Sequence, residues 1–84
     1  MATGMAGEHM INVEVRLFAT FREGREKKQV LTLAEGTEIS EVLNRLNINV
    51  EEVSILLLNG IDGPVDRRLN DGDVIAIFPP VGGG

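Results

Sequence analysis

The sequence predicts one small α+β domain, in which a mixed sheet of four to five strands carries one main helix across it. Three observations support this fold class: a stretch that alternates apolar and polar residues, a stretch with apolar residues at helical spacing, and further apolar runs bounded by turn residues. The chain has 84 residues, which is room for a single hydrophobic core. No internal repeat is visible.

The first two strands are expected at residues 11–17 and 29–33, joined as an antiparallel hairpin. Residues 18–21 are expected to extend the first strand, and the charged run 22–28 to form an exposed turn. The inward positions of both strands are apolar and alternate with polar ones, which is the pattern of half-buried strands: Ile11, Val13, Val15, Leu17, Leu31 and Leu33.

The helix is expected to begin at Gly36-Thr37-Glu38, with Thr37 as its N-cap. Its apolar residues recur at i, i+3, i+4 and i+7, so one stripe faces the core: Ile39, Val42, Leu43 and Leu46. Asn47 and Asn49 mark its end.

The second half contains two more main strands. The apolar run 53–58 predicts a central strand buried on both faces. Turns at Asn59-Gly60 and Asp62-Gly63-Pro64 leave room for a short strand between them. A turn at residues 70–73 precedes the last strand, Val74 to Phe78. Pro79-Pro80 ends its pairing, because proline has no N–H to donate.

Composition narrows the function classes. The chain carries 8 basic and 13 acidic side chains for a net charge of −5, which argues against binding to nucleic acid. With no Cys and only His9, disulfides, thiolate metal sites and histidine-dependent triads are excluded. We expect no metal site and no cofactor bound by the isolated domain. No signal peptide or long apolar run is visible, so we expect a cytoplasmic protein without a membrane partner.

The domain is expected to span residues 10–78, with both ends of the chain outside it. Residues 1–9 are expected to be a disordered leader or cloning remnant. Residues 79–84 are expected to be a flexible tail, and six residues reach roughly 20 Å. Glycines enter channels too narrow for side chains, and a terminal carboxylate can be activated as an acyl adenylate. The domain has no residue suited to that activation, so another protein must perform it.

Three stretches then carry a family resemblance: residues 17–23 (Leu-Phe-Ala-Thr-Phe-Arg-Glu), 69–74 (Leu-Asn-Asp-Gly-Asp-Val) and 78–84 (Phe-Pro-Pro-Val-Gly-Gly-Gly). With Asn59-Gly60 between them, they resemble the MoaD/ThiS family of ubiquitin-like sulfur carriers over residues 11–84. The resemblance is closest to the MoaD branch, the small subunit of molybdopterin synthase. It implies a β-grasp (ubiquitin-like) roll. Asp62-Gly63-Pro64 has no match in that branch.

The resemblance also implies a role and partners. In this family a ubiquitin-activating-type enzyme adenylates the terminal glycine with ATP, and a sulfur donor converts it to a thiocarboxylate. The sulfur then passes to a precursor bound by the large subunit of molybdopterin synthase. Such a carrier is not catalytic alone and is expected to be a monomer when free. Gly84 would bear the sulfur, and its neighbours would enter the partner: Gly83, Gly82, Val81 and Pro80.

Three further residues match family positions for docking. Phe78 and Phe18 match an apolar patch, and Arg22 matches an arginine that could pair with an acidic partner. The alternative is that both phenylalanines are core residues and that Arg22 is an ordinary surface charge.

Other functions remain open at this stage. The Phe-Pro-Pro-Val segment favours molybdenum or tungsten cofactor synthesis over thiamine or another sulfur-containing product. A ubiquitin-like modifier joined to target lysines through Gly84 would need the same activated carboxylate. A β-grasp binding module whose tail has no function is the remaining alternative.

Overall fold

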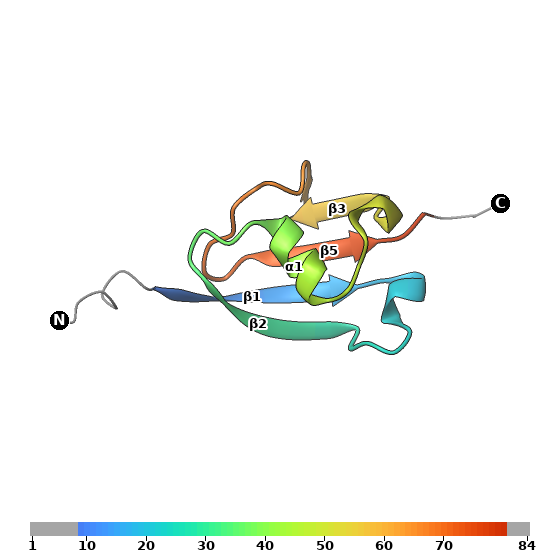
Figure 1. Cartoon of the computed structure of the whole chain (residues 1–84), viewed down its shortest axis with the longest axis horizontal. Coiled ribbons are helices and arrows are strands. Elements are labelled where there is room, and N and C mark those ends of the chain that lie inside the picture. The colour runs from blue at the N-terminus through green and yellow to red at the C-terminus, as the bar shows by residue number, and fades with distance from the viewer. Residues whose placement is uncertain (1–8, 81–84) are drawn as a thin grey trace.

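The computed structural model describes residues 9–80 and shows a five-stranded sheet in the order β2-β1-β5-β3-β4. One helix, α1, crosses one face of the sheet (Figure 1). The predicted α+β class is confirmed. β1 and β5 are parallel, and the other neighbouring strands are antiparallel. The elements in chain order are β1 Met10–Leu17, the 3-10 turn η2 Ala19–Arg22, β2 Lys28–Ala34, α1 Ile39–Arg45, the 3-10 turn η3 Val50–Glu52, β3 Ile55–Leu58, β4 Ile61–Asp62 and β5 Val74–Phe78.

The first hairpin forms as predicted, but its first strand is shorter than expected. β1 pairs with β2 from Met10↔Ala34 to Arg16↔Lys28. The predicted extension through residues 18–21 is wrong, because the chain turns into η2 directly after Phe18. Ala19 has a φ of 54°, in the left-handed region that turns the chain away from the strand direction. This turn brings Phe21 into the core, where only 6% of it is exposed.

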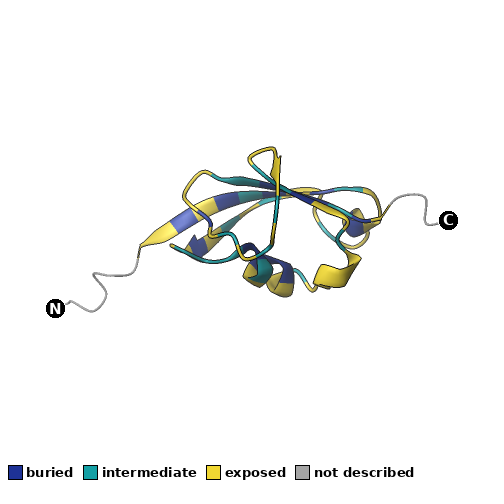
Figure 2. Ribbon diagram, turned by 90° about the horizontal axis from the view of Figure 1, so that it is seen from above, coloured by how far each residue is buried: buried dark blue, intermediate teal, exposed yellow. Residues whose placement is uncertain are grey.

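The core lies between the sheet and α1, and Figure 2 shows buried residues both in the sheet and in the helix. The predicted stripe of the helix is confirmed, with Ile39, Val42 and Leu43 buried and Leu46 packed against them. Neither α1 nor any other helix within residues 9–80 is long and apolar enough to cross a membrane. The fully buried members of the sheet lie in β1 and β5: Ile11, Val13, Val15, Leu17, Ile75 and Ile77.

The predicted N-cap of α1 is wrong by one residue. Glu38 occupies the N-cap position, and its backbone N–H donates to the carboxylate of Glu41 at 3.3 Å. This contact satisfies one backbone donor at the helix start. Thr37 instead donates its hydroxyl to the Ala34 carbonyl at 2.6 Å. Its side chain therefore closes the turn after β2 and does not cap the helix.

The prediction of a central strand buried on both faces at residues 53–58 is also wrong. The strand there, β3, begins only at Ile55, and this residue is 44% exposed. The central position belongs to β5, between β1 and β3. The physical reason is that α1 covers only one face of the sheet, so alternate residues of β3 face outward.

A two-residue turn joins β3 to β4, as the Asn59-Gly60 pair predicts. Asn59 and Gly60 have φ values of 53° and 86°, the double positive φ of a type I′ hairpin. The Asn59 side chain accepts from the Val74 N–H at 2.9 Å and donates to the Asp73 carboxylate at 2.9 Å. The hairpin is thereby joined to the start of β5.

The turn at residues 70–73 attaches the start of β5 to β1. The Asp71 carboxylate accepts from the Asn12 N–H at 2.8 Å, and the Gly72 N–H donates to the Asn12 carbonyl at 2.8 Å. The Glu14 N–H donates to the Asp73 carbonyl at 2.9 Å. These bonds set the register of the parallel pair that follows.

The segment without a match in the MoaD branch has a structural explanation. Arg67 donates to the carbonyls of Ile61 (2.7 Å), Pro64 (2.7 Å) and Leu56 (3.2 Å), so one guanidinium attaches the segment after β4 to β3. A Cβ at Gly63 would lie 3.0 Å from Cζ of Arg67. Glycine at this position therefore leaves space for the guanidinium.

We expect Gly63→Ala to lower the free energy of unfolding in the native chain, because the new methyl group displaces the hydrogen-bonded guanidinium of Arg67. In an Arg67→Ala background the same change should be neutral or stabilising, since alanine loses less backbone entropy on folding than glycine. Urea denaturation of the four proteins in this cycle should give a coupling energy of about 0.5 kcal/mol or more. Equal effects in the two backgrounds would contradict the contact.

Candidate functional site

The parallel register brings the two predicted docking phenylalanines together. β1 and β5 end side by side with Leu17 opposite Ile77, and the Phe18 N–H donates to the Ile77 carbonyl at 3.2 Å. The rings of Phe18 and Phe78 stack with centroids 4.3 Å apart and planes 10° from parallel. The stack therefore stands at the end of the sheet from which the chain continues into Pro79 (Figure 1).

Arg22 joins this stack from η2. Its Cζ lies 5.2 Å from the centroid of the Phe18 ring, within the range of cation–π attraction. Its Nε donates to the Leu17 carbonyl at 2.8 Å, which orients the guanidinium over the ring. The structure thus places all three predicted docking side chains, Phe18, Phe78 and Arg22, in one continuous group.

The alternative of core residues fits Phe21 better than it fits the stacked pair. Phe21 is buried among the core side chains, whereas Phe18 and Phe78 are half-buried. In β5 the inward positions are Ile75 and Ile77, so Phe78 lies on the sheet face opposite α1. An aromatic pair on an uncovered sheet face is available for contact with another protein.

The sequence prediction missed the neighbours of this pair on the same face. Ile55 lies opposite Phe78, and Leu57 lies opposite Ala76. We call Phe18, Phe78, Ile55, Ala76 and Leu57 the open-face strip. The period of two along a strand places Ala76 and Phe78 on one face, but the strip becomes visible only once the register between β3 and β5 is known.

The chain leaves the sheet through two prolines. Pro79 is buried and Pro80 is exposed. Neither has an N–H with which to continue the ladder beyond Phe78, so the predicted end of pairing agrees with the end of β5. The remaining predicted tail residues, Val81, Gly82, Gly83 and Gly84, lie outside the described residues, as do residues 1–8 of the expected leader.

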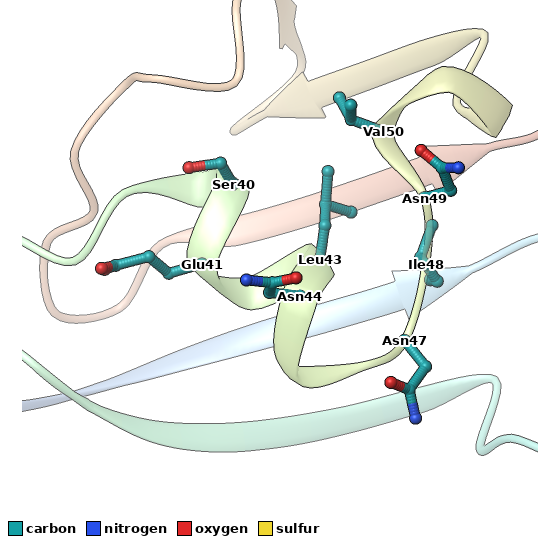
Figure 3. A pocket seen from close by; sticks show the side chains of 8 residues that line it. All are labelled: Ser40, Glu41, Leu43, Asn44, Asn47, Ile48, Asn49 and Val50. Carbon is teal, nitrogen blue, oxygen red and sulfur yellow. The ribbon is translucent and has the colours of Figure 1, made fainter.

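A separate recess of about 510 Å³ lies in the helical layer (Figure 3). None of the predicted site residues lines it, and one of its side chains already has a local role: the Asn49 side chain accepts from the Glu51 N–H at 3.1 Å. Within residues 9–80 no three His, Asp or Glu side chains gather as a metal site would require. The recess is lined by residues of α1 and of the segment after it: Ser40, Glu41, Leu43, Asn44, Asn47, Ile48, Asn49 and Val50.

Comparison with known proteins adds a family and a set of structural neighbours. The model of the ThiS family matches residues 15–84. No functionally curated protein matches the chain in sequence. Among solved structures, the HVO 2177 protein of Haloferax volcanii is 31% identical with a TM-score of 0.72, and the match covers 89% of this chain and 88% of that one.

Two further neighbours have informative names. Small archaeal modifier protein 1 of Methanosarcina acetivorans is 27% identical with a TM-score of 0.69, over 90% of this chain and 99% of that one. A chain in the complex of subunits 1 and 2 of the molybdopterin-converting factor from Helicobacter pylori is 26% identical with a TM-score of 0.61. That match covers 88% of this chain and 100% of that one.

The β-grasp fold implied by the sequence resemblance is therefore confirmed by both the architecture and these neighbours. The family model covers far more than half of the chain and includes the strip, the prolines and the terminal glycines. This small domain is a ubiquitin-like protein of the sulfur-carrier and small-modifier type, and it belongs to the ThiS family.

Proposed function

We propose that this protein carries sulfur on its C-terminal carboxylate for molybdenum or tungsten cofactor synthesis. The observation that carries the proposal is the open-face strip, which ends where the chain leaves β5 for Pro-Pro-Val-Gly-Gly-Gly. A partner that binds the strip would receive the tail at the same time. The likeness to a chain of the two-subunit molybdopterin-converting factor supports this pathway.

The chemistry requires an activating partner. The Gly84 carboxylate attacks the α-phosphorus of ATP and displaces pyrophosphate, which gives an acyl adenylate. A sulfur donor at the oxidation level of sulfide then attacks the acyl carbon and displaces AMP, which leaves a thiocarboxylate. The chain contains no Cys, so the sulfur must come from the donor. The partner in the first step is a ubiquitin-activating-type adenylating enzyme.

The delivery step requires a second partner, the large subunit of molybdopterin synthase. Gly83 and Gly82 lack a Cβ, and Val81 and Pro80 space the glycines from the domain, so the thiocarboxylate would reach an enclosed site. The rings of Phe18 and Phe78 are already stacked. A pre-ordered contact surface loses less side-chain entropy on binding than a mobile one, which favours this pair as the anchor.

Protein modification is the second candidate, and the likeness to small archaeal modifier protein 1 favours it specifically. The two functions share the acyl adenylate and differ in the nucleophile that follows. Attack by a sulfur donor gives a thiocarboxylate, whereas attack by a lysine amine gives an isopeptide bond. A carrier for thiamine or another sulfur-containing product would also form the thiocarboxylate, but it would pass the sulfur to a different acceptor.

Intact-mass spectrometry tests the carrier function. After incubation with ATP, the cognate adenylating enzyme and a sulfide donor, the chain should gain the mass of one oxygen replaced by sulfur. The gain should map to Gly84 and disappear in a chain that lacks Gly83 and Gly84, because no suitably placed carboxylate remains. An unchanged mass with an adenylating enzyme that consumes ATP in the presence of the chain would contradict the proposal.

The modifier function makes a different prediction in cell lysate. If the chain is conjugated to proteins, an epitope-tagged copy should appear in covalent species of higher mass, and deletion of Gly84 should abolish them. Peptide sequencing should then find glycine joined to lysine side chains. A lysate with only the free chain would exclude this second candidate under the conditions sampled.

Substitution of Phe78 by Asp tests the docking surface. A charge in the strip would have to be desolvated in the complex, so affinity for the large subunit should fall by about 30-fold or more, as expected for a central aromatic anchor. Isothermal titration calorimetry measures the affinity, and thermal unfolding checks that the domain remains folded. Val50→Asp, an exposed position on η3 away from the strip, is the matched control. Equal affinities of the two variants would assign Phe78 to packing.

A further inference from the structure

A cationic recess lies beside the stacked phenylalanines and joins Phe18 and Arg22 to three basic residues that have no role in the proposed function: Arg16, Lys27 and Lys28. It occupies about 370 Å³ between the end of β1, η2 and the start of β2. One side of it is the Phe18 ring, and the rest is basic: Arg16, Arg22, Lys27 and Lys28. We call this feature the basic recess.

Two of these cations are neighbours on adjacent strands. Arg16 of β1 and Lys28 of β2 are direct cross-strand partners on the face opposite α1. Like charges in this position destabilise a sheet. Glu14 pairs with Arg16, but among residues 9–80 neither Lys27 nor Lys28 has a side-chain hydrogen bond or ion pair. The recess thus concentrates positive charge at a cost to the fold.

Other basic residues of the chain do serve the fold. Arg25 donates to the carbonyls of Leu46 and Asn47, both at 3.2 Å, and so attaches the turn after η2 to the end of α1. Arg67 fixes the segment after β4 in the same way. Lys27 and Lys28 stand out against them in a chain whose net charge is −5. An external anion would relieve the repulsion in the basic recess.

We propose that the basic recess binds an acidic segment, carrying Asp or Glu side chains, of the protein that receives the tail. Continuity with the docking surface identifies this occupant. The recess shares Phe18 with the open-face strip, so a protein that covers the strip also lies over the recess. The inference rests on the proposed function for the existence of that partner. It adds that the partner's surface is acidic where it contacts the recess.

Charge complementarity would act before contact as well as after it. The rest of the chain is acidic, with three basic and nine acidic side chains in residues 30–84, so an acidic partner is repelled by most of the surface and attracted at the recess. Such a field orients the encounter and raises the association rate at low salt. The end of the sheet from which the tail leaves would therefore meet the partner first.

Zero-length crosslinking with a carbodiimide tests the contact directly, because this reagent joins a lysine amine only to a carboxylate that touches it. Lys27 and Lys28 are the only lysines in the sequence. The full chain is incubated separately with its cognate adenylating enzyme and with the large subunit. Mass spectrometry should map crosslinks from Lys27 or Lys28 to Asp or Glu residues of at least one of the two proteins. Lys27→Arg with Lys28→Arg should keep the affinity and lose these crosslinks.

Charge reversal provides the second arm. Lys27→Glu with Lys28→Glu should weaken association about tenfold at low salt, mainly through the association rate, and should flatten its salt dependence. Arg45→Glu with Arg68→Glu changes the net charge equally at exposed positions outside the recess, and should change the affinity by no more than about twofold. Equal losses in the two double variants would overturn the inference, because they would reflect net charge alone.

Two further results would also overturn it. One is the formation of stable complexes with both proteins, neither of which yields a crosslink from Lys27 or Lys28. The other is binding of inorganic phosphate or ATP to the recess, seen as chemical-shift changes at Lys27 and Lys28, without any crosslink to protein. Sulfur transfer to Gly84 in the absence of crosslinks would contradict this inference alone. Crosslinks in the absence of sulfur transfer would contradict the proposed function alone.

Discussion

The parallel pairing of β1 with β5 is the constraint on which the rest of the structure depends. It joins segments from opposite ends of the chain, and the turn at residues 70–73 sets its register through backbone bonds to Asn12 and Glu14. A slip of one residue would move the apolar side chains of β5 to the opposite face. The same register places Phe18 against Phe78, so the core and the proposed docking surface depend on the same strand pairing.

The second organising feature is that a single short helix covers only one face of the sheet. The covered face supplies the core, and the uncovered face divides into the open-face strip over β3 and β5 and the basic recess beside the ends of β1 and β2. Both meet at Phe18, next to the prolines that lead into the tail. The proposed function would use three features together: the apolar strip, the basic recess and the glycine-ended tail.

Local patterns in the sequence predicted most of the fold, because β1 alternates apolar and polar residues, the helix has a regular stripe, and turn residues bound the later strands. They did not predict the features that depend on contacts between residues far apart in the sequence. The turn at residues 19–22 forms because Phe21 fills the core, and alternate residues of β3 face outward because no second helix covers the other face of the sheet. The resemblance named Phe18, Phe78 and Arg22, whereas Ile55 and Leu57 required the register between strands. The charges at residues 22–28 suggested only an exposed turn, since their proximity to Phe18 depends on the folded hairpin.

The central claim is that this protein presents its C-terminus to partners in order to carry sulfur. The most direct measurement is mass spectrometry of the C-terminal peptide of the chain isolated from its own cells, under conditions that preserve thiocarboxylates. The account predicts that a fraction of the peptide carries sulfur in place of one oxygen at Gly84. A C-terminus found only as an unmodified carboxylate, or only joined to lysine side chains of other proteins, would contradict it.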